Sequence, residues 1–170
     1  SVDMLNESRS RIRAMALVHE KLYQREDFAR IDMKDYVEPL VESIRKTMDV
    51  SGRCAVKTDI TDINIDIDML VPLGLILNEI LSNSAMHAFE DEENPVVSVS
   101  IKKTGEGNLR MVISDNGKGL PSGFDISRSE SLGMKLIKLL VDQLNGTMEL
   151  NSNSGVEYVI TCPGGVAQLG

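Results

Sequence analysis

The clearest part of this chain is residues 109–119, which read Leu-Arg-Met-Val-Ile-Ser-Asp-Asn-Gly-Lys-Gly. Apolar and polar side chains alternate up to Asp115, which predicts a half-buried strand that ends there. The Asp115 carboxylate at this strand end can accept hydrogen bonds from an amino group of a ligand. Gly117 and Gly119 allow positive φ angles and a close approach of the backbone to that ligand. An ordinary Asn-Gly turn explains the same residues, so this stretch alone leaves both interpretations open.

Working outward, the same alternation over residues 96–103 predicts a hairpin with 109–115 across the turn at 105–108. Further strands are expected at 56–60, 63–67, 147–150 and 156–162, and helices at 4–25, 33–48, 69–89 and 131–144. Asp32 is a good N-cap for the second helix, and Pro39 inside that helix is expected to kink or shorten it.

This order of elements predicts an α+β fold, in which helices cover one face of a mixed, mostly antiparallel sheet. The 170 residues amount to about one domain, with ordinary fractions of apolar (42%) and charged (26%) residues. The first helix has an apolar stripe that needs a partner to cover it. The stripe consists of Met4, Leu5, Ile12, Met15, Ala16, Leu22 and Tyr23.

Composition excludes several classes of function. The formal charge of −8 argues against a nucleic-acid partner, because a net-negative surface repels phosphate backbones. Met69–Leu77 is the longest uncharged apolar run and is too short to cross a bilayer, so no membrane contact is expected. Cys54 and Cys162 have no metal-ligand spacing and are expected to be reduced thiols of a cytosolic protein.

Glu79 and Asn83 form the first polar pair that could carry chemistry. They lie four positions apart and are therefore neighbours on one surface of the 69–89 helix. Carboxylate and amide oxygens suit a nucleotide-bound Mg²⁺ ion. A solvated polar face explains the pair equally well from spacing alone, and Asn78 points about 100° away.

The second candidate is Ser131-Leu132-Gly133-Met134-Lys135, where a loop enters a helix. Free N–H groups and the positive end of the helix dipole make such a junction an anion site suited to phosphates. A plain Ser131 N-cap is the alternative. The sequence has neither a P-loop nor a G-x-G-x-x-G fingerprint, so any nucleotide would be bound by another architecture.

The order and spacing of these polar and glycine-rich stretches make residues 73–163 resemble the ATP-binding catalytic domain of sensor histidine kinases. This domain belongs to the superfamily of DNA gyrase, Hsp90, histidine kinase and MutL. Residues 75–83 look like the N box, 115–119 like the first glycine box, and 131–136 like the second. Residues 145–147, Gly155 and residues 159–163 match the closing hairpin. Residues 10–23 are similar to the second dimerisation helix of the subfamily with the second type of phosphoacceptor domain.

The resemblance implies a two-layer α/β sandwich of the Bergerat ATP-binding type, preceded by an N-terminal helix. It divides the chain into a partial dimerisation helix, residues 1–30, and an ATP-binding domain, residues 31–170. It also implies roles for the site residues. Asn83 would coordinate Mg²⁺, Glu79 would be catalytic, and Asp115 would hold the adenine amino group. Gly117 and Gly119 would shape the pocket wall and hinge a lid at 120–130. The phosphates would meet Leu132, Gly133 and Met134, and His87 would have a structural or pocket role.

Two positions depart from the family pattern. Met86 stands where a basic residue usually follows the metal-binding Asn, and Lys118, Arg128 or Lys135 could supply the missing positive charge. Val156 stands where a Thr often follows the glycine of the last hairpin, so the adenine contact of that Thr is in question.

The expected function is ATP-dependent phosphorylation of a histidine, with Mg²⁺ as cofactor and a response regulator as downstream partner. His19 belongs to the second dimerisation helix, so the acceptor histidine is expected on a preceding helix that this chain lacks. The full-length protein is expected to be a homodimer, and a monomeric state is open for this fragment. The expected location is the cytoplasm, where the chain could also be the cytoplasmic part of a membrane-anchored sensor. The alternatives are a catalytically weak nucleotide-binding module and a serine kinase or anti-sigma factor of the same superfamily.

Overall fold

The computed structural model describes residues 2–23, 30–48, 52–85, 94–125, 128, 131–152 and 154–163. Within these ranges the helices are α1 (Val2–Tyr23), α2 (Met33–Met48), α3 (Leu70–Asn83) and α4 (Leu132–Gln143), with a short 3₁₀ helix, η1 (Ile67–Met69), ahead of α3. The strands are β1 (Arg30–Asp32), β2 (Ala55–Ile60), β3 (Asn64–Asp66), β4 (Val96–Lys103), β5 (Leu109–Asp115), β6 (Thr147–Asn151) and β7 (Glu157–Cys162).

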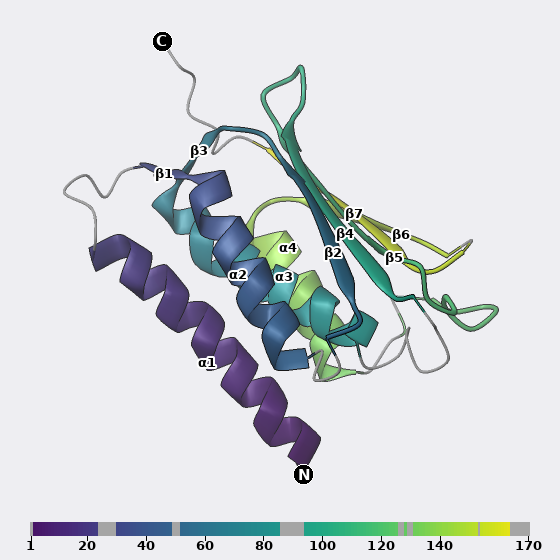
Figure 1. Ribbon diagram of the computed structural model, residues 1–170. Helices are drawn as coiled ribbons and strands as arrows, with labels where there is room; N and C mark the ends of the chain where they lie inside the picture. The colour runs from purple at the N-terminus through teal and green to yellow at the C-terminus, as the bar shows by residue number, and fades with distance from the viewer. Residues whose placement is uncertain are drawn as a thin grey trace.

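The main sheet has the strand order β2-β4-β5-β7-β6. Only β2 and β4 pair in parallel, and the other three pairs of this sheet are antiparallel. A separate two-stranded sheet joins β1 to β3. Figure 1 shows α2, α3 and α4 on one face of the main sheet, so the predicted α+β sandwich is confirmed.

The buried face of β5 places Asp115. Leu109, Met111, Ile113 and Asp115 are all buried, because side chains on a strand alternate between its two faces. The last member of this row is a carboxylate instead of an aliphatic side chain. Asp115 therefore points from the end of β5 toward the helical layer.

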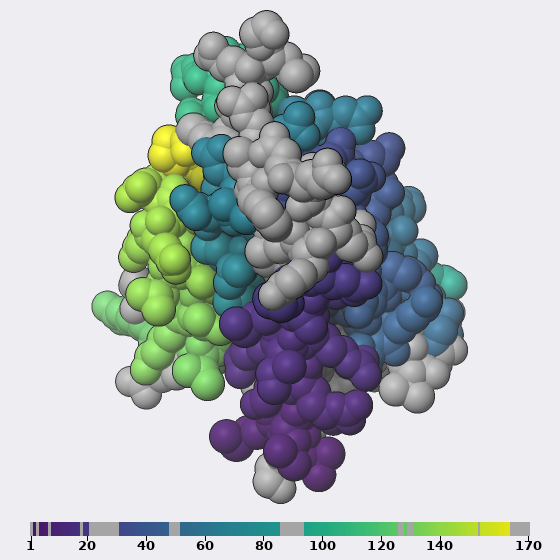
Figure 2. Space-filling model, turned by 90° about the vertical axis from the view of Figure 1, so that its left-hand side faces the viewer, coloured from purple at the N-terminus to yellow at the C-terminus, as the bar shows by residue number. Residues whose placement is uncertain are grey.

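Helix α1 lies on the outer side of the helical layer, away from the sheet (Figures 1 and 2). It contacts α3 and α2, and its buried residues Ser10 and Ala14 are small enough to let two helix backbones approach closely. The predicted apolar stripe lies largely uncovered in this chain, as expected for a face that needs a partner helix. Ile12 and Met15 are 66% and 52% exposed, and Met4 and Leu5 are exposed as well.

One expectation about the helices changes and another is confirmed. Pro39 lies inside α2, but the helix runs continuously from Met33 to Met48. The predicted Asp32 cap is confirmed, since its Oδ1 accepts a hydrogen bond from the Asp35 N–H at 3.1 Å. Helix α3 continues beyond Asn83 as a π-helical turn at Ser84 and Ala85, and its predicted end at residue 89 lies outside the described residues. No helix within the described ranges has both the length and the apolar character that crossing a membrane requires.

Candidate active site

A cavity of about 500 Å³ opens between α3, the start of α4 and the ends of β5 and β7, a volume typical of small-molecule sites. Seven of the predicted site residues line it, namely Glu79, Asn83, Asp115, Gly119, Leu132, Gly133 and Met134. Ser84, Lys118, Val156 and Tyr158 line it too. Two further positions lie outside the described residues: the predicted pocket residue His87, and Met86, which stands where the family usually has a basic residue.

One end of the cavity is built around the Asp115 carboxylate, which is 9% exposed. Its Oδ1 accepts two backbone hydrogen bonds, from Gly117 N–H at 2.9 Å and from Val156 N–H at 3.2 Å. Its Oδ2 accepts a hydrogen bond from the Ser84 hydroxyl at 2.9 Å. These three donors fix the orientation of the carboxylate before any ligand arrives.

Gly155 makes this arrangement possible. Its φ is +105°, and a Cβ atom at this position would overlap the carbonyl oxygen of Asp115. The backbone of residues 155–156 can therefore lie against the end of β5 only without a side chain at Gly155. Asp115 N–H also donates to the Val156 carbonyl at 3.0 Å, which closes the contact.

The two glycines of the first box behave differently. Gly119 lines the cavity with a φ of +78°, as predicted. Gly117 is not among the glycines with positive φ, so that part of the prediction was wrong. Gly117 contributes its N–H to Asp115, a role that needs no left-handed backbone.

The other end of the cavity combines α3 with the first turn of α4. A Cβ atom on Gly133 would lie 3.1 Å from Glu79 Oε2 and 3.7 Å from Asn83 Oδ1, so the three residues meet at one point. Ser131 is the N-cap of α4, and its Oγ accepts the Met134 N–H at 3.2 Å. That cap leaves the N–H groups of Leu132 and Gly133 without an intrahelical partner, which suits an anionic group.

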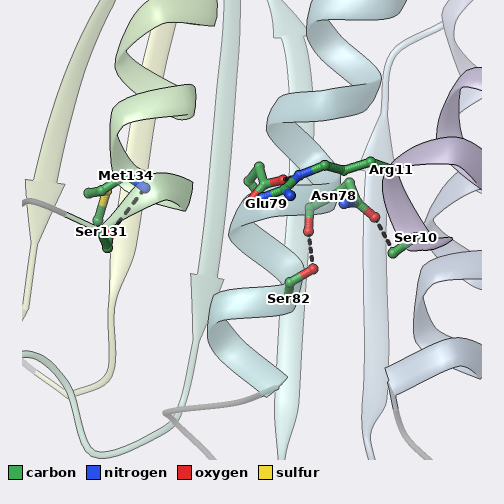
Figure 3. A network of polar contacts seen from close by, with 7 residues as sticks. All are labelled: Ser10, Arg11, Asn78, Glu79, Ser82, Ser131 and Met134. Carbon is green, nitrogen blue, oxygen red and sulfur yellow. Dashed lines mark hydrogen bonds and ion pairs between the residues drawn. The ribbon is translucent and has the colours of Figure 1, made fainter. Parts of the chain in front are cut away.

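Glu79 is buried, contrary to the alternative of a solvated polar face. It is 4% exposed, and its Oε1 lies 2.5 Å from Arg11 Nε of α1. Beside this ion pair, the Ser10 hydroxyl donates to Asn78 Oδ1 at 2.5 Å. Figure 3 shows both α1 side chains reaching α3 on the side of Glu79 away from Ser131 and Met134. The pair compensates for burying the carboxylate and ties α1 to the site.

Tyr158 of β7 contacts the predicted metal ligand. Its hydroxyl hydrogen-bonds with the Asn83 side chain. Burial raises the pKa of Tyr158 and the nearby Asp115 charge raises it further, while the Asn83 hydrogen bond acts in the opposite direction. Tyr158 is therefore a neutral phenol at physiological pH that helps to orient the Asn83 amide.

Sequence reasoning missed five residues that the structure brings to the site or to its support: Ser10, Arg11, Asn78, Ser84 and Tyr158. Ser10 and Arg11 stand in the segment that resembled a dimerisation helix, but no spacing signal connects them with residues 68 positions later. Of the three proposed substitute cations, Lys118 lines the cavity. His19 is exposed on α1, about 12 Å along the helix axis from Arg11.

A mixed sheet, one helical layer and a cavity between two helices and the strand ends define an ATPase fold without a P-loop. The chain belongs to the histidine kinase-, DNA gyrase B- and HSP90-like ATPase family, whose model matches residues 70–165. A histidine kinase family model matches residues 1–48. The chain thus joins the dimerisation region of a sensor histidine kinase to its ATP-binding domain.

Relatives agree with this assignment. The chain is 27% identical over 168 residues to the sensor histidine kinase PdtaS of Mycobacterium tuberculosis, covering 96% of this chain and 33% of that protein. It is 30% identical over 108 residues to blue-light-activated histidine kinase 2 of Erythrobacter litoralis, covering 62% of this chain and 31% of that protein. The chain spans about a third of the length of these curated relatives.

The fold is also that of a solved structure. The histidine kinase domain from the Erythrobacter litoralis EL346 blue-light activated histidine kinase superposes with a TM-score of 0.84 at 22% identity. The match covers 92% of this chain and 74% of that one. At this identity the likeness establishes the fold alone.

Proposed function

We propose that this chain is the ATP-binding catalytic part of a two-component sensor histidine kinase that transfers the γ-phosphoryl group of ATP to a histidine. The observation that carries the proposal is a single cavity with an oriented carboxylate at one end and Glu79, Asn83 and Gly133 together at the other. A carboxylate acceptor suits the adenine amino group. A helix N-terminus beside amide and carboxylate oxygens suits a metal-bound triphosphate.

The oxygen atoms at the phosphate end of the cavity suit a Mg²⁺ ion that is bound mainly by the nucleotide. Asn83 Oδ1 would be a protein ligand, with phosphate oxygens and water completing the coordination. The ion would neutralise charge on the phosphates during transfer. Gly133 leaves open the space beside Glu79 and Asn83 that a side chain would fill.

In the proposed reaction an imidazole nitrogen attacks the γ-phosphorus, and the bond from that phosphorus to the bridging oxygen breaks to release ADP. Glu79 would orient the attacking imidazole by accepting its N–H hydrogen bond. Arg11 engages Glu79 Oε1, so Oε2, which faces Gly133, is the oxygen available for this role.

The acceptor and partners lie beyond this chain in the proposal. We place the acceptor histidine on a helix that precedes α1, because His19 is far along α1 from the Glu79 contact. We further propose that a response regulator receives the phosphoryl group and that the full-length protein is a cytoplasmic homodimer. The proposed boundary between the dimerisation helix and the catalytic domain lies near residue 30. The histidine kinase match over residues 1–48 favours this over an anti-sigma factor.

Titration calorimetry with ATP, with and without Mg²⁺, tests the proposal. The chain should bind one ATP, Asp115→Asn should abolish binding, and Asn83→Ala should keep binding but lose its Mg²⁺ dependence. In the full-length protein, Glu79→Gln should abolish acid-labile phosphohistidine while ATP still binds. Absence of ATP binding at millimolar concentration would overturn the proposal.

A further inference from the structure

The adenine end of the cavity contains a hydroxyl group with no assigned role, that of Ser84. This residue is 4% exposed, lines the cavity, and donates to Asp115 Oδ2 at 2.9 Å. It follows the predicted metal ligand Asn83 directly. The α3 helix widens to a π-helical turn at Ser84, a local feature that is frequent at functional sites.

The hydrogen bonds to Asp115 show how much of the carboxylate remains for a ligand. Each carboxylate oxygen has about two acceptor positions. Gly117 and Val156 N–H groups occupy both positions on Oδ1. Ser84 occupies one position on Oδ2, so a single acceptor position faces the cavity. Val156 supplies only a backbone group, and Ser84 is the side-chain donor to Asp115 within the described part of the chain.

A nearby hydroxyl shows that this placement is specific. Ser82 also lies on α3 and lines the cavity, but its hydroxyl donates to the backbone carbonyl of Asn78 at 2.5 Å. Two serines on one helix, two positions apart, therefore have different partners. Only Ser84 is paired with the carboxylate that we assign to adenine.

We propose that Ser84 is a specificity-determining residue that reads the N1 nitrogen of adenine, an inference that rests on the proposed function. On the Watson–Crick edge of adenine an amino donor lies beside the N1 acceptor. Asp115 Oδ2 and Ser84 Oγ, 2.9 Å apart, offer an acceptor beside a donor, which is the complementary order. Hydroxyl hydrogens rotate to suit their partners, so Ser84 can turn from Oδ2 to N1.

This rotation conserves hydrogen bonds. In the free protein the Ser84 hydrogen satisfies Asp115 Oδ2. On binding, the adenine amino group donates to Oδ2 at the position that faces the cavity, while Ser84 turns to donate to N1. No buried polar group is left without a partner in either state, which a site of this burial requires. The edge of guanine carries the opposite order, a carbonyl beside an N–H, and would set its carbonyl against the carboxylate.

Replacing the N1 atom of the ligand tests the inference first on the unchanged protein. Titration calorimetry of the wild-type chain with Mg²⁺ compares ATP with 1-deaza-ATP, in which N1 is replaced by C–H. ATP should bind about five- to tenfold more tightly. Ser84→Ala should bind both nucleotides with nearly the same affinity, because the N1 contact is already lost. Ser82→Ala, the matched control on the same helix, should retain the preference for ATP.

The outcomes separate three cases. Equal binding of ATP and 1-deaza-ATP by the wild-type chain overturns the role of Ser84 while leaving ATP binding intact. A Ser84→Ala chain that weakens both nucleotides and keeps the wild-type preference also overturns it, since this result assigns Ser84 only to holding Asp115. A wild-type chain that binds neither nucleotide overturns the proposed function and the inference with it.

Discussion

The two ends of the cavity are built in different ways. At the adenine end, Asp115 is held by Ser84 and by the backbone of residues 117 and 156, all within the α3 and sheet region. At the phosphate end, Glu79 is held by Arg11 from α1. The proposed base-binding carboxylate, Asp115, thus depends on the α3 and sheet region, whereas the proposed catalytic carboxylate, Glu79, depends on a helix of the dimerisation region. Changes in α1 should therefore reach the phosphate end and spare the adenine end.

The largest effect should come from Gly155→Ala at the adenine end. The added Cβ overlaps the carbonyl of Asp115, so the backbone that carries the Val156 N–H must move away. We expect a loss of about 3 kcal/mol in the free energy of unfolding, measured by urea denaturation. Adenosine and ATP binding should be lost together.

Gly107→Ala is the matched control for that experiment. Gly107 has a similar positive φ of +80°, but no atom lies within 4 Å of its added Cβ. It should lose only about 1 kcal/mol from backbone strain and keep nucleotide affinity. Equal losses for the two variants would contradict the close approach at Asp115.

Arg11→Ala should have the next largest effect, because it leaves the buried Glu79 carboxylate without its cation. A loss of about 2 kcal/mol in the free energy of unfolding is expected, and adding Glu79→Gln should recover part of it. Affinity for adenosine should not change, while affinity for ATP should. A change in adenosine affinity as large as that for ATP would end the distinction between the two ends.

Arg13→Ala controls for the loss of an arginine from α1. Arg13 donates to Thr47 Oγ1 at 2.9 Å on the exposed surface. Exposed polar contacts of this kind contribute little, so both stability and nucleotide affinity should stay close to wild type. A loss equal to that of Arg11→Ala would mean that α1 is sensitive to any change.

Ser10→Ala should have a smaller effect on the same helix contact. It removes the hydrogen bond to Asn78, which is 1% exposed, and should lower the free energy of unfolding by about 1 kcal/mol. Because Arg11 remains, ATP affinity should be unchanged in calorimetry. A Ser10→Ala chain with altered ATP affinity would show that Asn78 belongs to the site itself.

Tyr158→Phe should have the smallest effect and should sharpen the comparison within the phosphate end. It removes the hydrogen bond to the Asn83 side chain without changing the shape of the buried ring. The Mg²⁺-dependent part of the ATP affinity should fall about threefold. Adenosine affinity serves as the internal control, and its decline would place Tyr158 at the adenine end.

The adenine end was largely predictable from sequence because its main signal is local. The alternation over 109–115 puts Asp115 on the buried face, and the glycines after it follow directly. Ser84 was not identified, and Gly155 was identified only as the glycine of the closing hairpin, because their contacts with Asp115 join segments 31 and about 40 residues apart. Spacing along one helix cannot report such partners.

The phosphate end was predicted only in part. The four-residue spacing placed Glu79 and Asn83 together, but their burial and the contact with Arg11 depend on how α1 docks. Periodicity identified an apolar stripe on α1 and gave no information about which face meets α3. The docking face has the small residues Ser10 and Ala14, which allow close helix packing and carry little hydrophobic signal.

The contact between α1 and α3 also bears on how the chain is synthesised. Ser10 and Arg11 are translated 68 residues before Asn78 and Glu79. At about 5–20 residues per second, the ribosome adds the intervening segment in roughly 3–14 s. During that time α1 lacks the α3 part of its docking surface, and its exposed Met and Ile side chains are available to chaperones or to a second nascent chain. In the proposed homodimer, assembly with the second subunit can therefore begin before α3 has been made.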